Sequence, residues 1–228
     1  MKFLCNDKHC DMHIHSSCSD GILTPDDIVY CASKKGMKVI SITDHDTMKA
    51  YFSIDKRAYE NSGVSIITGV EMSCIYKGHR IHLLMYNINP RMFEILKPIF
   101  YKKYEGHVNK YISLENASRL SKILGGKLIL AHPYKYPYYQ GESLVNDILK
   151  EKKLDGIECI HSNNKKEEIE RLLKYCDDNN LYVGVGSDYH YDYRMYKQYK
   201  RVSSIGYLDA LHIDIATFLS ENMEIKKR

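Results

Sequence analysis

Residues 11–21 read DMHIHSSCSDG and contain the most informative pattern of the chain. Asp11, His13 and His15 are spaced by two, so in an extended strand all three side chains point to the same face. Asp20 follows five residues after His15 and precedes a glycine. We therefore predict a first strand around Asp11–His15 that presents ionisable side chains to one side.

Further short apolar runs follow this segment along the chain. They are rich in β-branched residues and four to seven residues long, as is typical of buried strands. The predicted strands are Lys38–Thr43, Val64–Val70, Arg80–Tyr86, Lys127–Ala131, Gly156–Ile160 and Tyr182–Val185.

Helical signals fall between these runs. Thr24 and Pro25, followed by two aspartates, form a helix start, and Gly36 is placed where a helix commonly ends. Further helices are predicted over Thr47–Asn61, Ser113–Leu124, Glu142–Lys152, Lys165–Asn179 and Leu208–Leu219. Strand and helix alternate about seven times, which predicts a parallel α/β protein. The short strands and many units favour a barrel over an open sheet, as a single domain over residues 1–228.

The composition excludes several classes of protein. The hydrophobic content of 44% and the charged content of 27% are typical of a globular chain, and no apolar run approaches the roughly 18 residues of a membrane span. The N-terminal segment is too polar for a signal peptide. Seven cysteines without a C-x-x-C pair indicate reduced thiols, so a cytoplasmic protein is expected. The lysines are scattered and the net charge is only +4, which does not indicate stable binding to duplex nucleic acid.

Histidines and carboxylates recur at or near the ends of the predicted strands. In a barrel or a parallel sheet, the carboxyl ends of the strands are where functional side chains converge. Imidazole and carboxylate together are ligands for zinc, manganese or iron. Nine such side chains exceed what one ion can take and suit three ions. The nine are His13, His15, Asp20, His45, Glu71, His82, His132, Asp188 and His190.

In this order the motifs resemble those of the PHP (polymerase and histidinol phosphatase) family. The resemblance runs from about Asp11 to His190 and rests on DMHIH, SDG, TDHD, GVE, His82, AHP and SDYH. Within the family, the stretches D-x-H-x-H-S, S-D-G-x-x-T-P and I-T-D-H-D-T are most similar to small phosphoesterases that act on nucleoside bisphosphates and on short RNA 5′ ends.

The resemblance implies a distorted (β/α)7 TIM-like barrel with a trinuclear centre of manganese, zinc or iron. A hydroxide that bridges two ions would attack the phosphorus. The first ion would be held by His13, His15, Glu71 and Asp188. The second would be held by Glu71, as the bridge, with His82 and His132. The third would be held by Asp20, His45 and His190. Catalysis would depend most on Glu71, Asp188 and His190.

The resemblance also implies a metal-dependent phosphoesterase that hydrolyses phosphomonoesters of a small molecule, a nucleotide or a short oligonucleotide. Only 49 residues separate His82 from His132, where nucleotide-acting relatives carry a larger insertion that touches the substrate. Lys135 stands where relatives often have an arginine and would bind a phosphate as a point charge. His161 either lines the pocket or belongs to a helix cap. The tyrosines at 134–139 and 189–199 either stack on a base or pack.

Three alternatives stay open at this point. One is a histidinol-phosphatase-like activity on an amino alcohol phosphate. An amidohydrolase is disfavoured, because that chemistry commonly uses a carbamylated lysine on the fourth strand, where this chain has His82. A PHP module kept only for interaction would tend to lose ligands, and this chain keeps all nine. Asp11 and Asp44, beside the presumed ligands, are expected to orient histidine rings.

Overall fold

The computed structural model describes residues 1–190, apart from residues 6, 8, 107 and 136–140. The predicted helix at Leu208–Leu219 and the tyrosines beyond Tyr189 lie outside the described residues. None of the helices in the described part of the chain has the length and apolar character needed to cross a membrane.

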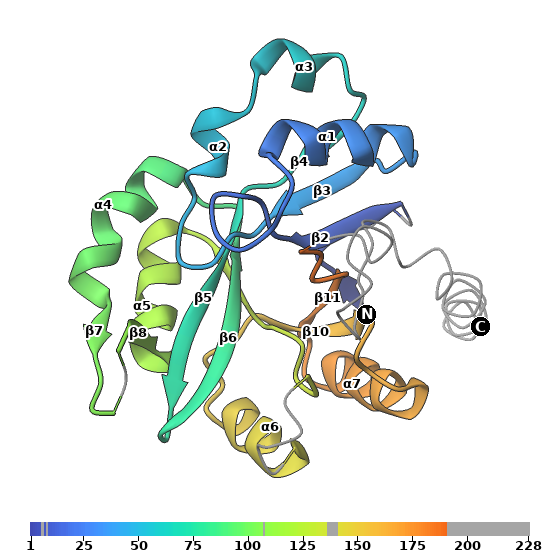
Figure 1. Cartoon of the computed structure of the whole chain (residues 1–228). Helices are drawn as coiled ribbons and strands as arrows, with labels where there is room; N and C mark the ends of the chain where they lie inside the picture. Colours follow the sequence, from blue (N-terminus) through green and yellow to red (C-terminus); the bar gives the residue numbers. More distant parts are fainter. Residues whose placement is uncertain (6, 8, 107, 136–140, 191–228) are drawn as a thin grey trace, which may run out of the picture.

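Strands and helices follow one another along the chain as Figure 1 shows. The strands are β1 (Lys2–Phe3), β2 (Cys10–Ile14), β3 (Val39–Ile42), β4 (Ser65–Ile66), β5 (Gly69–Tyr76), β6 (His79–Tyr86), β7 (Lys102–Lys103), β8 (Lys110–Ser113), β9 (Lys127–Leu130), β10 (Gly156–His161) and β11 (Tyr182–Gly186). The helices are α1 (Pro25–Lys34), α2 (Ala50–Ser53), α3 (Lys56–Glu60), α4 (Pro90–Phe100), α5 (Leu114–Leu124), α6 (Gly141–Lys150) and α7 (Lys166–Asp178).

The strands close into a distorted barrel with the helices on the outside (Figure 1). One sheet has the order β1-β11-β10-β9-β6-β5-β8-β7, and the other has the order β2-β3-β4. Single bridges join the two sheets, one between Ile14 and Tyr189 and one between His45 and Glu71. Among the described residues the ring has seven positions, in the order β2, β3, β4 together with β5, β6, β9, β10 and β11. The predicted seven-unit TIM-like barrel is therefore confirmed.

The predicted parallel arrangement does not hold at one of the predicted strands. β6 runs antiparallel to both β5 and β9, with Tyr76 opposite His79 across a two-residue turn. Lys77 and Gly78 in that turn have φ values of 48° and 80°, the positive values that a tight hairpin turn requires. A hairpin needs only two connecting residues, whereas a parallel crossover needs a dozen or more, so this turn decides the strand direction.

Other boundaries also differ from the predictions. The run at Val64–Val70 divides into β4 and the start of β5, and the helix expected over Thr47–Asn61 divides into α2 and α3. The segment between β6 and β9 forms α4, β7 and β8 before α5, and only α5 was predicted there. Asn89 begins α4 by accepting hydrogen bonds from the amides of Arg91 and Met92, with a proline at the first position.

The helix signals that the sequence predicted elsewhere are present in the structure. Thr24 Oγ1 accepts the amide of Asp27 at the start of α1, and Ser113 Oγ caps α5 through the amide of Asn116. Gly125 ends α5 with φ 69°, a left-handed conformation that favours glycine.

Apolar side chains fill the barrel interior beneath the strand ends that carry the ionisable side chains. Met12, Leu84, Tyr86, Ile129 and Ala131 form a buried cluster there, and the Tyr86 hydroxyl donates to the Met12 carbonyl at 2.7 Å. A larger cluster packs the sheet against α4, α5, α6 and α7. This packing supports the strand ends from which the polar side chains project.

Candidate metal centre

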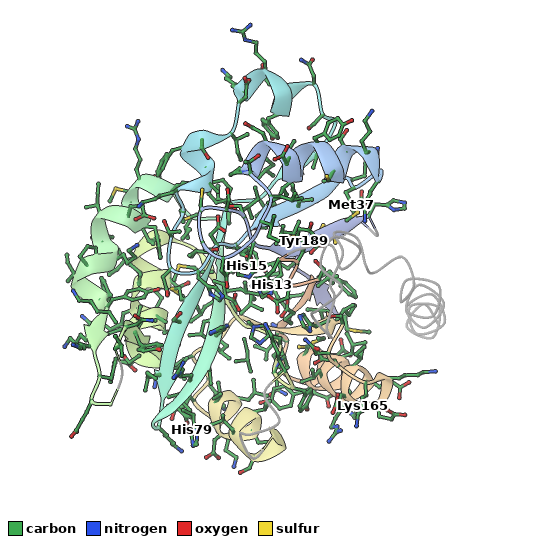
Figure 2. All side chains as sticks on the ribbon, viewed as in Figure 1. His13, His15, Met37, His79, Lys165 and Tyr189 are labelled. Atoms are coloured by element: carbon green, nitrogen blue, oxygen red, sulfur yellow. The ribbon has the colours of Figure 1, made fainter. Side chains whose placement is uncertain are left out.

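The nine side chains proposed as ligands gather at one end of the barrel. His13 lies on β2 and His15 directly follows it, and Figure 2 shows both near the centre of the molecule. Glu71 lies on β5 and His82 on β6, while the others follow strands in loops. Ligand atoms lie within 4.8 Å of one another in three groups: His15, Asp20, His45 and His190; His13, Glu71, His132 and Asp188; and His45, Glu71 and His82.

Glu71 is fully buried at the centre of these groups, and its two oxygens face different histidines. Oε1 lies 2.9 Å from His82 Nδ1 and 2.7 Å from His132 Nε2. Oε2 lies 3.2 Å from His13 Nε2, 3.0 Å from His15 Nε2 and 3.3 Å from His45 Nδ1. Yet Oε2 makes no hydrogen bond, although it is buried. A buried carboxylate oxygen without a donor requires a compensating positive charge.

The first predicted ligand set has the spacing of a closed coordination shell. His13 Nε2 and His15 Nε2 are 3.1 Å apart, and each lies 3.3–3.4 Å from Asp188 Oδ1. Their distances to Glu71 Oε2 are similar. Metal–ligand bonds of about 2.0–2.1 Å in a tetrahedron place ligand atoms about 3.3 Å apart. The donor atoms present therefore fit a small divalent cation.

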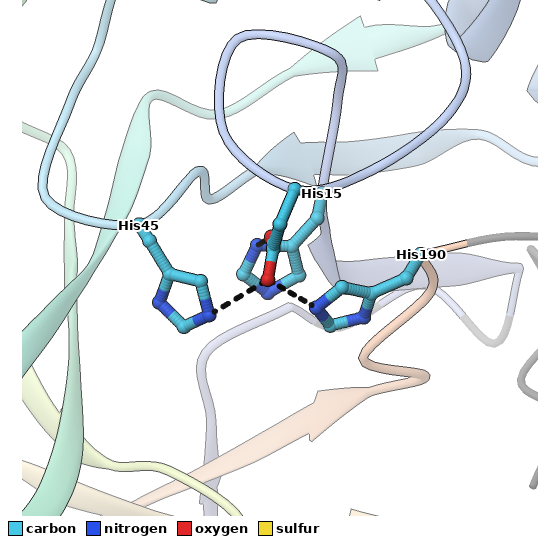
Figure 3. Close-up of side chains that lie close together, drawn as sticks. His15, His45 and His190 are labelled. Atoms are coloured by element: carbon cyan, nitrogen blue, oxygen red, sulfur yellow. Dashed lines mark ion pairs between the residues drawn. The ribbon is translucent and has the colours of Figure 1, made fainter.

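Asp20 lies on the open rim of the site, with 54% of its side chain exposed. Figure 3 shows His15, His45 and His190 around its carboxylate, with the ion pairs dashed. Oδ2 lies 3.4 Å from His190 Nε2 and 3.6 Å from His45 Nε2. His190 Nδ1 donates to the carbonyl of Asp188 at 2.9 Å, which leaves Nε2 to face Asp20. Desolvation opposes ionisation of Asp20, but the hydrogen bond and charge of His190 outweigh it and hold its pKa below the ordinary value.

The structure links the three predicted sets more closely than the sequence implied. His45 faces Glu71 through Nδ1 and Asp20 through Nε2, so it lies between the first and third sets. His15 Nδ1 also lies 3.5 Å from Asp20 Oδ1. Contacts between the imidazoles complete the cluster, with the rings of His15 and His190 stacked at a centroid distance of 4.1 Å.

The histidines of the site fall into two classes by the direction in which their pKa values are shifted. Burial tends to lower the pKa of His15, but the adjacent carboxylates of Asp188 and Glu71 raise it to about 9. The pKa of His13 is likewise raised, because Glu158 and Glu71 outweigh its desolvation. Burial lowers the pKa values of His132 and His161 to about 4. Without an ion, protons on His13 and His15 balance the buried carboxylates, and a divalent cation would displace them.

We expect the metal-free protein to lose stability as the pH falls from about 6.5 to about 4. In the unfolded chain His132 and His161 take up protons below pH 6.5, whereas in the folded chain they stay neutral until about pH 4. Each therefore removes roughly 1 kcal/mol from the free energy of unfolding per pH unit in this window. His13 and His15 are protonated in both the folded and the unfolded chain in this window, so they change the stability only above pH 6.5.

Denaturant unfolding at pH 7, 6 and 5 measures this loss. His161→Asn should reduce the pH slope by about one proton, and His9→Asn, at an exposed position, should leave it unchanged. A free energy of unfolding that stays constant between pH 6.5 and pH 5 would contradict the prediction.

Lys135 and His161 meet at the same carboxylate oxygen. Lys135 Nζ donates to Asp188 Oδ2, and His161 Nε2 lies 3.8 Å from that atom. His161 Nδ1 accepts the amide N–H of Asn163, so the proton of the neutral ring is on Nε2. His161 is fully buried and precedes α7 by several residues, with Lys165 at the N-cap. Its side chain therefore faces the site and is not part of the helix cap.

Other expectations are resolved by packing. Asp44 does not orient a histidine ring directly; it accepts hydrogen bonds from the amide and hydroxyl of Ser16 and from the hydroxyl of Ser19. It thereby shapes the loop that carries Asp20. Asp11 accepts hydrogen bonds from the amides of His13 and Ser187.

Tyr134 and Tyr189 pack against apolar clusters, which favours the packing interpretation for these two tyrosines.

One site residue was missed from the sequence. Glu158 on β10 is fully buried, with Oε1 2.9 Å from His13 Nδ1 and Oε2 2.6 Å from the amide nitrogen of His132. The signal was present, because a carboxylate within the apolar run Gly156–Ile160 is unusual unless it is paired.

Comparisons with known proteins agree with this geometry. The PHP domain family matches residues 11–188. The chain is 22% identical to a 3′,5′-nucleoside bisphosphate phosphatase of Chromobacterium violaceum, over 79% of this chain and 86% of that protein. A 93-residue segment, 40% of the chain, is 37% identical to a 5′-3′ exoribonuclease of Haemophilus influenzae. That match spans only 34% of the length of the exoribonuclease.

Solved structures share the fold. An amidohydrolase from Chromobacterium violaceum, solved with bound sulfate and no metal, superposes with a TM-score of 0.69 and 19% identity, over 80% of this chain and 87% of that one. A structure named as a metal-dependent phosphoesterase of Bifidobacterium adolescentis gives a TM-score of 0.66 and 19% identity, over 90% and 95% of the two chains. The ordered motifs, the barrel and the match over residues 11–188 lead to one conclusion: the chain belongs to the PHP domain family.

Proposed function

We propose that the protein is a metal-dependent phosphoesterase that hydrolyses phosphomonoesters of a small molecule or a nucleotide. The observation that carries the proposal is the position of Glu71, whose two oxygens face separate groups of histidines at a buried barrel end. Relatives named as a nucleoside bisphosphate phosphatase and as a phosphoribosyl cyclic phosphate phosphodiesterase support phosphoester chemistry.

The nine side chains would hold up to three divalent ions of manganese, zinc or iron. When bound, such ions supply activation of water and stabilisation of the charge that develops on a phosphoryl group. The roles would follow the three predicted sets, with Glu71 common to the first two. Glu71, Asp188 and His190 are the residues on which we expect catalysis to depend most. All seven cysteines are free thiols, which fits a reducing compartment such as the cytoplasm.

The protein's own cation and imidazole would bind the substrate phosphate. The Lys135 side chain is about one quarter exposed, and its ammonium group can turn from Asp188 towards an incoming anion. His161 offers a neutral Nε2–H from the barrel wall, beside the same carboxylate oxygen. A charged donor and a neutral donor on one side of the site would orient the phosphoryl group before reaction.

The substrate is expected to be small. The connection between His82 and His132 is filled by α4, β7, β8 and α5, which pack against the sheet and against each other. A phosphorylated metabolite, a nucleotide or the end of a short oligonucleotide would fit such a site.

The proposal is tested on protein stripped of metal and reloaded with manganese, zinc or iron. Phosphate release is measured from nucleoside 3′,5′-bisphosphates, 5′-phosphorylated short RNA and histidinol phosphate, with elemental analysis of each preparation. We expect more than one equivalent of bound metal, and hydrolysis that disappears on chelation and returns on reloading. Protein that takes up no transition metal and gains no activity would contradict the proposal, whereas metal-loaded but inactive protein would favour an interaction module.

A further inference from the structure

The buried carboxylate of Glu158 lies behind the candidate metal centre, on the far side of His13 from Glu71. Its Oε1 pairs with His13 Nδ1 at 2.9 Å, and its Oε2 accepts the amide N–H of His132 at 2.6 Å. Its side chain is only 1% exposed, so both contacts are made in a dry environment. One carboxylate therefore contacts residues of two different predicted ligand sets.

We propose that Glu158 is a positioning residue that fixes the spacing between the first and second metal sites, by orienting the side chain of His13 and the backbone of His132. The inference rests on the proposed metal binding and adds a residue that contacts neither substrate nor ion. Its role would be to hold the two metal sites at a fixed spacing. Its loss should therefore weaken metal binding at both sites together.

The contact with His13 determines which ring nitrogen faces the site. An ionised carboxylate can only accept hydrogen bonds, so His13 Nδ1 must carry the donated proton. Nε2, 3.2 Å from Glu71 Oε2 and 3.4 Å from Asp188 Oδ1, is then the nitrogen whose lone pair would serve the first ligand set once an ion displaces its proton. Carboxylates that bond the far nitrogen of a ligating histidine fix its tautomer and ring orientation in this manner.

The contact with His132 acts through the backbone. His132 has a φ of 24°, in the left-handed region that a residue with a side chain seldom adopts. The Glu158 hydrogen bond holds the amide of this residue, while the ring Nε2 reaches Glu71 Oε1 at 2.7 Å. Strained backbone that persists at a functional site needs such external support.

Gly186 on β11 leaves the space that this arrangement needs. A Cβ atom at this position would overlap His13 Cβ and would lie 2.5 Å from Glu158 Oε1. Any side chain here would therefore push the His13–Glu158 pair apart. Gly186 gives an independent way to disturb the same contact without removing the carboxylate.

Metal affinity of the stripped protein tests the proposal directly. Zinc and manganese are titrated into the wild-type protein, Glu158→Gln and Gly186→Ala, in competition with a chromophoric chelator, after the fold of each metal-free protein is checked by circular dichroism. The matched control is Asp155→Asn. Asp155, directly before β10, accepts the amide of Leu128 on β9 at 2.9 Å through Oδ2, so it also joins these two neighbouring segments, but through no proposed ligand.

We expect Glu158→Gln and Gly186→Ala each to lower the affinity for both the first and the second equivalent of metal about 10- to 100-fold. Asp155→Asn should bind both equivalents as the wild type does, even if its melting temperature falls. If Glu158→Gln does not fold, Gly186→Ala alone decides. A folded variant with wild-type affinities, or with only one equivalent weakened, would overturn the coupling. Wild-type protein that binds no metal would overturn the proposed function as well.

Discussion

Replacing Glu71 by glutamine is expected to lower kcat by at least about three orders of magnitude while the chain still folds. The carboxylate has five imidazole nitrogens within 3.3 Å, divided between its two oxygens. An amide offers one acceptor oxygen and one NH2 group, so it can serve only one of the two groups of histidines. Both the ligand set and the charge balance would be lost together.

The charge of Glu71 is strongly favoured in the folded protein. Burial alone would raise its pKa, but the charges of His82, His13 and His45 outweigh this and hold the pKa well below its ordinary value. Glutamine removes that negative charge, so two positively charged ions would lie close together without their shared partner. We therefore expect reduced metal content as well as reduced turnover.

Steady-state kinetics on a phosphorylated substrate, together with elemental analysis, measure both effects. Glu151→Gln is a suitable control, because that carboxylate bonds Tyr76 and Lys153 outside the candidate metal centre. Retention of a tenth of the wild-type kcat by Glu71→Gln would refute the assignment of Glu71 as the shared ligand.

Replacing Lys135 by alanine is expected to raise KM for a phosphorylated substrate by at least about tenfold and to leave the metal content unchanged. A hydrogen bond to a charged group contributes roughly 1.5–3 kcal/mol, equivalent to about a 10- to 150-fold change in kcat/KM. Lys135 lies beside Asp188 Oδ2 and His161, at the edge of the ligand cluster. Removal of its ammonium group takes away one phosphate donor and leaves the nine proposed ligands in place.

Lys77→Ala is the matched control for this variant. Lys77 also pairs with an aspartate, Asp147, at 3.1 Å, but it lies in the β5–β6 turn and is 59% exposed. Its loss should leave KM unchanged. If kinetics on an established substrate do not respond to Lys135→Ala, the phosphate must be bound by other groups, and His161→Asn would be the next variant to examine.

Much of the site could be predicted from local patterns. The two-residue spacing of His13 and His15 places both rings on one face of any extended strand, whatever the remainder of the fold. His132 and Asp188 follow apolar runs, and strand ends in a barrel point towards a common opening. These rules need only neighbouring residues, which is why the sequence predicted the convergence of the nine side chains that the structure brings together.

Distances between strands could not be predicted in this way. The hairpin at Lys77–Gly78 reverses β6, so His82 approaches Glu71 across an antiparallel pair and not from a parallel neighbour. The position of His45 between Asp20 and Glu71 depends on how its loop packs against β5. Asp44 shapes the Asp20 loop through contacts with Ser16 and Ser19, which lie 28 and 25 residues earlier in the chain.

The sequence by itself determined the family motifs and the set of candidate ligands, because these depend on residue type and on local periodicity, and the resemblance that the motifs carry implied the barrel. Only the tertiary structure decided that the two oxygens of Glu71 face different histidines and that Glu158 joins His13 to His132. Glu158 is separated from His13 by 145 residues, and its oxygens reach both partners only because β2, β9, β10 and β11 close around one interior. Such a contact is a property of the closed barrel, in which burial forces each polar atom to find a partner.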